Sequence, residues 1–400
     1  MTPRRKVAVV LVDRANYGRM QPVMKAIQAR PELELLVVCG GTLLLERFGK
    51  GIENIKADGF EIAAQIYVEL EGSNPVTMTK SLGYAVGEFA TAFQHLKPDI
   101  VLVIGDRYEA LGATLAASYM NLCLVHIQGG EVSGSIDESA RHCMTKLSHY
   151  HFPSTAQSAD YIMRMGERPD AVFHVGCPSG DIIHRMDRAL PDDFLSNVGV
   201  GAKINPNQPF LMVTYHPVTT HYEQARVEAE QLMQALARLR MPTLWLWPNI
   251  DAGSDGVSKT IRLHREHDPD VDNWLQMVKN FTPETYLKLL ANAACAVGNS
   301  SSFLRDASFL GTPVVLTGDR QNLRETAEHV TKVPLDPEIM VTAIEAQLAH
   351  GPYPASTLYG DGQASERIAE HLCHVDLYAQ KYLYYAEREA YERDKHREPV

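Results

Sequence analysis

Acidic side chains gather in one short stretch of the sequence, HIQGGEVSGSIDESARH, at residues 126–142. Glu131 and Asp137 follow an apolar run, and a third carboxylate, Asp106, follows the apolar run before it. Carboxylates that share a partly dry cleft raise one another's pKa, which suits a general acid or base near neutrality. An aspartate next to an arginine, as in GDRYE, is by itself more typical of a helix cap with an ion pair. We expect Asp106, Asp137 and Glu131 to transfer protons because all three follow strand ends that should meet at one edge.

A histidine from the second half of the chain is expected to face these carboxylates. His216 stands in TYHPVT directly before Pro217, which interrupts regular structure and leaves the ring exposed at a strand end. A single histidine is usually structural, as we expect for His126 inside an apolar run. The position of His216 at the start of the second half favours a functional role.

A phosphate-binding site is predicted at VGNSSS, residues 297–302, where a strand gives way to a helix. Backbone N–H groups, the hydroxyls of Ser301 and Ser302 and the helix dipole all attract an anion there. The same residue types are also good helix N-caps, so the motif alone leaves both interpretations open. Arg320 and Arg324 in GDRQNLRE favour phosphate. The glycine patterns of NAD-binding and P-loop sites are missing from the sequence.

Other polar side chains also follow apolar runs. Arg14 follows the first run and Arg107 follows the third. Asn249 and Asp251 lie in the glycine-rich segment WPNIDAGSDG, which could hydrogen-bond a base or ribose or could be an ordinary surface loop.

These groups must be positioned by a repeating pattern of short apolar runs and longer amphipathic segments. The pattern is typical of buried parallel strands joined by helices, and it predicts helices at residues 75–96 and 108–120. The expected strands in the first half lie in KVAVVLV, LELLVVCGG, DIVLVIGD, CLVHIQGG and AVFHVGCPS, and those in the second half lie in FLMVTYH, TLWLWPN, ACAVGNSS and TPVVLTGD.

Two domains are expected from the way this pattern restarts. It resumes after the Gly-, Pro- and Asn-rich residues 192–209, which resemble a linker. We predict an α/β fold with two Rossmann-like, doubly wound domains facing each other across a cleft. The N-terminal domain should span residues 1–190, the nucleotide-binding C-terminal domain residues 205–375, and a C-terminal helix residues 376–400. Ligands of such sheets bind at the carboxyl ends of the strands, where the candidate residues lie.

The composition excludes several classes of function. The 400 residues carry a net charge of −11, which offers no basic face for nucleic acid. The six cysteines form no CxxC pair, which argues against a zinc or disulfide framework and suits the cytoplasm. The first apolar run is too short for a signal peptide, and no stretch is long enough for a membrane span.

Together, RANYGR, GDRYE, HIQGGEVSGSIDESARH, HPVTT, PNIDAGS, GNSSS and GDRQ resemble the motifs of the hydrolysing UDP-N-acetylglucosamine 2-epimerases. That family makes N-acetylmannosamine for sialic-acid synthesis, and the motifs keep its order along residues 6–330. The resemblance implies a GT-B-like fold and an elimination followed by an addition. A base removes the proton at C2 while UDP leaves C1, and water then adds to the 2-acetamidoglucal. It implies no metal and no nicotinamide cofactor. We also expect a homo-oligomer, a dimer or tetramer.

The resemblance also assigns individual residues. It places the catalytic carboxylates on Asp106 and Asp137, and it places the histidine near the diphosphate on His216. The implied substrate contacts are Arg14, Arg107, Gln128, Asn249, Ser301, Ser302, Asp306 and Arg320.

Several positions depart from the family's pattern, including Asp306 for a glutamate and Val12-Asp13 for Gly-Thr or Gly-Ser. Gln128 replaces a glutamate of many members and cannot take a proton at neutral pH, so either the two aspartates suffice or Glu131 takes over part of the role. Phe303 and Leu323 replace glycines, and these bulky groups are expected to reshape the sugar or ribose pocket. This keeps a bacillosamine-type substrate open.

Four alternatives stay open at this point. The same hydrolysing reaction could act on a 2,4-diacetamido-2,4,6-trideoxy nucleotide sugar for legionaminic acid synthesis. The protein could be a non-hydrolysing 2-epimerase or a GT-B glycosyltransferase. It could also bind a nucleotide sugar without chemistry. The base of the nucleotide, uracil or guanine, is not determined by these motifs.

Overall fold

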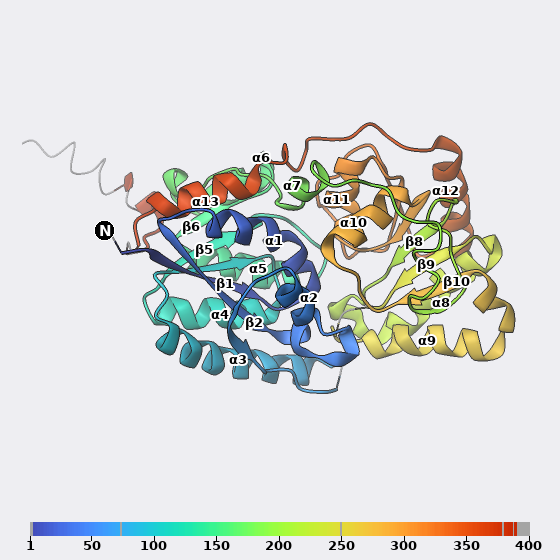
Figure 1. Ribbon diagram of the computed structural model, residues 1–400, viewed down its shortest axis with the longest axis horizontal. Helices are drawn as coiled ribbons and strands as arrows, with labels where there is room; N and C mark the ends of the chain where they lie inside the picture. Colours follow the sequence, from blue (N-terminus) through green and yellow to red (C-terminus); the bar gives the residue numbers. More distant parts are fainter. Residues whose placement is uncertain (1–2, 73, 249, 378–379, 387, 390–400) are drawn as a thin grey trace, which may run out of the picture.

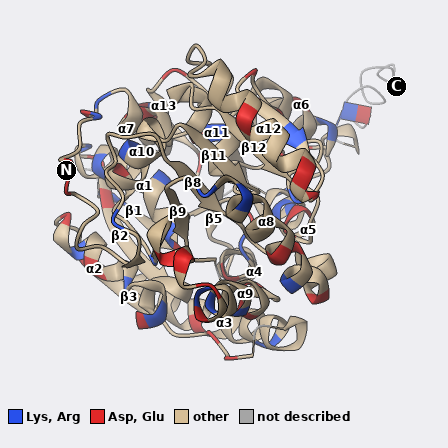
Figure 2. Ribbon diagram, turned by 90° about the vertical axis from the view of Figure 1, so that its right-hand side faces the viewer, with Lys and Arg blue, Asp and Glu red and all other residues tan. Residues whose placement is uncertain are grey.

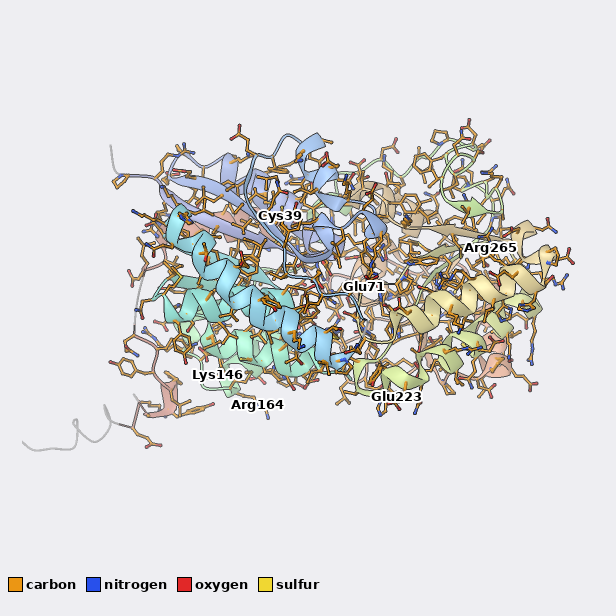
Figure 3. The ribbon with its side chains drawn as sticks, turned by 90° about the horizontal axis from the view of Figure 1, so that it is seen from below. Cys39, Glu71, Lys146, Arg164, Glu223 and Arg265 are labelled. Carbon is orange, nitrogen blue, oxygen red and sulfur yellow. The ribbon has the colours of Figure 1, made fainter. Side chains whose placement is uncertain are left out.

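The computed structural model describes residues 3–72, 74–248, 250–377, 380–386 and 388–389. Within these residues the chain forms two α/β domains that lie side by side, each built on a largely parallel sheet (Figure 1). The expected fold class is therefore confirmed. Seen from below, Cys39 and Lys146 mark the first domain, and Glu223 and Arg265 mark the second (Figure 3).

The first sheet has the strand order β3-β2-β1-β4-β5-β6 within the described residues, and its strands pair in parallel. The order reverses between β1 and β4, and a crevice forms at such a switch point outside the carboxyl ends of the strands. The strands are β1 (Arg5–Leu11), β2 (Leu33–Gly40), β3 (Ile62–Ile66), β4 (Ile100–Ile104), β5 (Cys123–Ile127) and β6 (Tyr150–Phe152).

The second sheet has the order β13-β12-β11-β8-β9-β10-β7 among the described residues, and its switch point lies between β8 and β11. All neighbours are parallel except β7, which runs antiparallel to β10 at the edge. The strands are β7 (Val200–Gly201), β8 (Leu211–Thr214), β9 (Thr243–Leu246), β10 (Leu275–Val278), β11 (Cys295–Gly298), β12 (Val314–Thr317) and β13 (Val330–Val333).

Helices cover both faces of each sheet (Figure 1). The α-helices are α1 (Arg14–Gln28), α2 (Gly51–Ala57), α3 (Pro75–Leu96), α4 (Tyr108–Tyr119), α5 (Asp137–Leu147), α6 (Ala156–Arg164), α7 (Ser179–Ile183), α8 (Ala225–Leu239), α9 (Ser254–His267), α10 (Pro283–Asn292), α11 (Ser302–Leu310), α12 (Pro337–His350) and α13 (Ala364–His374). Short 3-10 helices occupy Gly41–Leu44, Glu46–Phe48, Pro169–Ala171, Thr219–Gln224 and Pro269–Asn273.

The local sequence explains the elements that border the site. All five residues of β4 and of β5 are buried, as expected for strands covered on both faces. Helix α3 begins with a capping box in which Asn74 and Thr77 each accept from the other's backbone N–H, and it has the predicted bounds. His126 is a satisfied core histidine, as expected, because its ring nitrogens contact the Thr145 hydroxyl and the Gly105 carbonyl.

Two segments differ from the expectations. The predicted strand AVFHVGCPS makes a single bridge, between Val172 and His151, because Gly176 has a positive φ and turns the chain toward α7. The predicted linker at residues 192–209 is packed rather than loose. It supplies Leu195 and Ile204 to the core of the second domain and adds strand β7 to its sheet.

The chain returns to the first domain after α12. Helix α13 packs beside α1, and Ile368 and Leu372 are buried in the core of the first domain (Figure 1). Helix α13 therefore packs with the first domain, although the predicted boundary at residue 375 had placed it in the second. The predicted C-terminal helix at 376–400 lies partly outside the described residues. Within the described part, residues 380–383 are not helical, whereas residues 384–386 and 388–389 are helical. Lys381 pairs with Glu167 at 2.5 Å.

Basic and acidic segments are interspersed around the outer helices (Figure 2). Among the described helices, none combines the length and the apolar character needed to span a membrane.

Candidate active site

A cavity of about 150 Å³ lies between the two domains, where the two switch points face each other. Residues after β1 and β4 line it from the first domain, and residues after β8 and β11 line it from the second. The sequence-predicted residues that line this cavity are Arg14, Asp106, Arg107, Gln128, Glu131, Asp137, His216, Ser301, Ser302, Asp306 and Arg320. Asn249 lies outside the described residues.

Asp106, at the carboxyl end of β4, is held by an arginine from α5. The Arg141 guanidinium, which is almost fully buried, donates to Asp106 Oδ2 and also to the Glu131 carbonyl at 2.7 Å. Burial by itself would raise the pKa of Asp106. The guanidiniums of Arg141, Arg324 and Arg305 outweigh that effect and lower this pKa below its ordinary value. Asp106 is therefore ionised at neutral pH.

Asp137, the first residue of α5, has a different environment. Its Oδ2 accepts from the Ser135 hydroxyl at 2.9 Å, and the Arg320 guanidinium lies 3.5 Å away. Burial and the nearby charge of Asp106 raise the pKa of Asp137, and Arg320 opposes this only in part. Two carboxylates with pKa values shifted in opposite directions are the usual arrangement for a separate charge stabiliser and proton-transfer group.

Glu131 forms a buried ion-pair cluster across the domain boundary. Its carboxylate lies 2.9 Å from Arg305 Nη1 and 3.2 Å from Arg324 Nη2, both from the second domain. Burial would raise the pKa of Glu131, but Arg305 and Arg324 lower it. Arg324, which the sequence suggested for phosphate, also donates from Nε to the Val132 carbonyl at 3.1 Å.

Gln128 makes two hydrogen bonds of fixed direction. Its Oε1 accepts from Arg305 at 3.0 Å, so its amide nitrogen faces Cys177 Sγ at 3.2 Å. The thiol in turn contacts Ser179, whose hydroxyl donates to Asp306 at 2.6 Å. A glutamate at position 128 could not donate to the thiol, so the glutamine fits this row of side chains.

His216 is buried at the end of β8. Asn299 holds its backbone from both sides, because Asn299 Oδ1 accepts from the His216 N–H at 2.8 Å and Asn299 Nδ2 donates to the His216 carbonyl at 2.7 Å. Burial, with Arg320, Arg14 and Arg107 nearby, lowers the pKa of His216 well below its usual range. The ring is therefore neutral at pH 7.

The predicted phosphate site at residues 297–302, which we call the phosphate cradle, lies between the end of β11 and the start of α11. Gly298 has a φ of +136°, and a Cβ there would lie 2.1 Å from the Thr214 carbonyl oxygen, so the turn requires glycine. Ser301 is the N-cap residue of α11, yet its side chain makes no capping hydrogen bond. Its hydroxyl instead contacts Arg305, and the Ser302 hydroxyl contacts the Tyr286 hydroxyl at 2.5 Å. Both serines line the cavity, and the Ser301 hydroxyl is not used to cap the helix.

Two arginines of the first domain reach across to the second. Arg14 donates to the backbone carbonyls of Lys279 and Trp247. Arg107 is bound by Glu109 on its own side and by Asp251 on the other, and the Asp251 side chain is buried. Asp251 is therefore part of the domain contact and not of an exposed loop.

The two bulky residues near the cradle do not shape the cavity. Phe303 is fully buried in the core of the second domain, and Leu323 is 81% exposed. Neither side chain lines the cavity, so the expectation that they reshape it was wrong. Leu323 has a φ of +64°, which explains why glycine suits that position.

The chain matches known proteins along most of its length. A family model described as UDP-N-acetylglucosamine 2-epimerase matches residues 25–373. A Legionella pneumophila protein named UDP-N,N'-diacetylbacillosamine 2-epimerase (hydrolyzing) is 33% identical over 376 residues, which cover 94% of this chain and 97% of the relative.

The chain belongs to the UDP-N-acetylglucosamine 2-epimerase family. This confirms the resemblance that the motifs suggested.

Two further known proteins resemble the chain, one in sequence and one in fold. A Campylobacter jejuni protein named GDP/UDP-N,N'-diacetylbacillosamine 2-epimerase (hydrolyzing) is 28% identical over 82% of this chain and 84% of its own length. The crystal structure of Methanocaldococcus jannaschii UDP-GlcNAc 2-epimerase in complex with UDP-GlcNAc and UDP has a TM-score of 0.76. The structural match covers 92% of this chain and 99% of the Methanocaldococcus jannaschii chain. The sequence identity is 17%, so the match supports a shared fold.

Two buried arginines of this candidate site were not predicted from the sequence. Arg141 stands in the quoted stretch IDESARH, four residues after Asp137, so helical spacing places both on one face of α5. Arg305 stands four residues after Ser301 and points toward the same cavity. The spacing was a usable signal, but the partners across the cleft were not visible in the sequence.

Proposed function

We propose that this protein is a hydrolysing 2-epimerase of a UDP-activated 2-acetamido sugar, which it converts to the free 2-epimer and UDP. The observation that carries the proposal is the cavity itself. Two aspartates with oppositely shifted pKa values face a serine-lined helix N-terminus across the domain boundary.

Each part of the cavity has a role in this reaction. The N-terminus of α11, with Ser301 and Ser302, holds the diphosphate, and Arg320 with neutral His216 faces it. As the C1–O bond breaks, its electron pair leaves with the diphosphate, and these donors stabilise the added charge. Asp137 removes the C2 proton, and the C2–H electron pair becomes the C1–C2 double bond. Ionised Asp106 holds Arg141 in place and raises the pKa of Asp137.

The second half of the reaction adds water to that double bond. The oxygen of water bonds to C1 and a proton returns to C2. Because the configuration at C2 inverts, the proton must return to the face opposite the one it left. A second proton-transfer group is therefore needed. Ionised Asp106 takes a proton from the water whose oxygen bonds to C1 and delivers it to C2, and Asp137 releases to solvent the proton that it removed. Glu131 is fully engaged by two arginines, so we assign it to holding the domains together.

The sugar is proposed from the relatives. The motifs alone favoured UDP-N-acetylglucosamine, with a 2,4-diacetamido-2,4,6-trideoxy sugar as the alternative. Both hydrolysing relatives described above are named for N,N'-diacetylbacillosamine, which supports the alternative. We propose UDP-N,N'-diacetylbacillosamine as the principal substrate. A cytoplasmic location and a homo-oligomeric state are proposed from the sequence as well.

Product analysis tests this function. The protein is incubated with UDP-N,N'-diacetylbacillosamine, its GDP analogue and UDP-N-acetylglucosamine, and released nucleotide and free sugar are identified by mass spectrometry and NMR. We expect free 2-epimer and free UDP, with kcat/KM highest for the diacetamido substrate. A 2-epimer still attached to UDP would place the protein in the non-hydrolysing class. Transfer of the sugar to an acceptor would indicate a glycosyltransferase.

A further inference from the structure

Arg305 connects the two walls of the cavity with one guanidinium. It lies on α11 with a side chain that is 5% exposed. Nη1 donates to Gln128 Oε1 at 3.0 Å and to Glu131 Oε2 at 2.9 Å, both in the first domain. Nη2 donates to Ser301 Oγ at 2.7 Å in the second domain. The planar group is thus fixed at both ends.

The bond to Ser301 has one possible direction. A guanidinium only donates, so the serine oxygen must accept, and the hydroxyl proton must point away from Arg305. Among the described residues, the Ser301 hydroxyl makes no second side-chain hydrogen bond and does not cap α11. Ser301 lines the cavity, so its proton is available to a ligand there.

Glu131 and Gln128 prevent the guanidinium from turning away. Both accept from Nη1, and both are buried in the first domain. Arg324 also pairs with Glu131, at 3.2 Å, but it donates to the Val132 backbone and not to a serine. The two arginines therefore share the ion pair, and Arg305 alone of the two contacts the phosphate cradle.

We propose that Arg305 is a positioning residue that orients the Ser301 hydroxyl as a donor to the leaving diphosphate. The inference rests on the proposed function, because it requires the diphosphate to bind at the N-terminus of α11. Arg305 acts through the serine and need not touch the nucleotide.

A double-mutant cycle tests the proposal, with UDP affinity measured by calorimetry. Ser301→Ala removes a hydrogen bond to a charged group and should weaken UDP binding about tenfold to a hundredfold. Arg305→Met as a single variant should weaken UDP binding by a similar factor. In the Ser301→Ala background, Arg305→Met should have less than about a twofold further effect, because coupled residues are not additive.

Arg324→Met is the matched control. It removes the other arginine of Glu131 and leaves the Arg305–Ser301 bond in place. In the double variant of Arg324 and Ser301, the two losses of binding free energy for UDP should simply add. If Arg305→Met does not fold, Arg305→Lys replaces it in the cycle, because lysine keeps the charge beside Glu131 but lacks the planar fork.

The outcomes separate this inference from the proposed function. Unchanged UDP affinity in Ser301→Ala would overturn the assignment of the phosphate cradle. A clear loss in Ser301→Ala, with additive effects of the arginine variant, would overturn the role of Arg305 and leave the cradle intact. Equal coupling of Arg324 and Arg305 to Ser301 would also overturn it, since both arginines would then act through the ion pair.

Discussion

Asp106 and Asp137 lie in one cavity, but their neighbours shift their pKa values in opposite directions. Asp106 faces the guanidinium of Arg141, whereas Asp137 faces the carboxylate of Asp106 and a more distant Arg320. Residue identity therefore supplies the carboxylates, and the placement of a few arginines decides which of them can carry a proton near neutrality.

The two aspartates should be needed for the rate and not for binding. Asp106→Asn and Asp137→Asn keep the shape of the side chain and remove its ability to accept a proton. Each should lower kcat about 10²–10⁴-fold. UDP affinity, measured by calorimetry, serves as the control and should change little. If both variants kept a near-wild-type kcat, the proton-transfer groups would have to be sought elsewhere.

The pH dependence should report on Asp137. Because Asp137 must be ionised to accept the C2 proton, kcat/KM should fall as the pH drops through its raised pKa. The acid limb should therefore lie above the ordinary aspartate pKa of 3.8. Arg320→Gln removes the positive charge that lowers this pKa, so the limb should move to higher pH. A limb that stays in place or moves to lower pH would assign it to another group.

Glu131 should matter for stability. Glu131→Gln leaves the buried Arg305 and Arg324 without their carboxylate, and breaking such an ion pair costs about 3–5 kcal/mol of unfolding free energy. Urea denaturation measures this cost. If instead the variant kept its stability and lost as much kcat as Asp137→Asn, Glu131 would be the substitute for the missing glutamate at position 128.

At the scale of elements, the strand ends decide where the site forms. The strand-to-helix turn after β11 needs Gly298, because its backbone has a positive φ and passes close to the Thr214 carbonyl. That close approach lets the first residues of α11 face the cavity. The strand-to-helix turn after β1 is fixed in another way. The Asp13 side chain caps α1 by accepting from the Asn16 N–H at 2.6 Å.

Gly298→Ala should therefore destabilise the second domain and weaken UDP binding. A Cβ 2.1 Å from a backbone oxygen forces the turn to move. Gly59→Ala is the matched control, since Gly59 also has a positive φ, of +87°, but no atom lies within 4 Å of its added Cβ. The control should lose about 1–2 kcal/mol in urea denaturation. The claim fails if Gly298→Ala loses no more than the control.

At the scale of the whole molecule, charged side chains hold the cleft closed. Arg14, Arg107 and Glu131 of the first domain each bind a group of the second, and all three line the cavity. The same side chains therefore connect the two domains and line the cavity, so we expect domain closure and assembly of the site to be linked.

Asp251→Asn tests this link away from the predicted phosphate cradle. It removes the charge that Arg107 meets across the cleft. Without UDP, the variant should show a larger radius of gyration by small-angle X-ray scattering. UDP should restore the wild-type value, with affinity reduced about threefold to tenfold, since closure draws on binding energy. Unchanged scattering and affinity would show that this pair does not control closure.

Much of the fold could be predicted from the sequence because buried parallel strands and amphipathic helices have local signatures. The bounds of α3 were predicted correctly, and most of the expected strands formed. The strand predicted at AVFHVGCPS did not form beyond one bridge, because a short apolar run has no period that identifies it as a strand. A glycine that turns the chain cannot be distinguished from one that ends a strand.

The sequence by itself determined which chemical groups are available and which strand ends carry them, because those depend on residue type and local pattern. The tertiary structure alone decided which arginine meets which carboxylate. Arg141 meets Asp106, and Arg305 meets Glu131, through contacts between segments far apart in the chain. A pKa depends on charges within a few ångströms, and those distances exist only after the two domains have folded against each other.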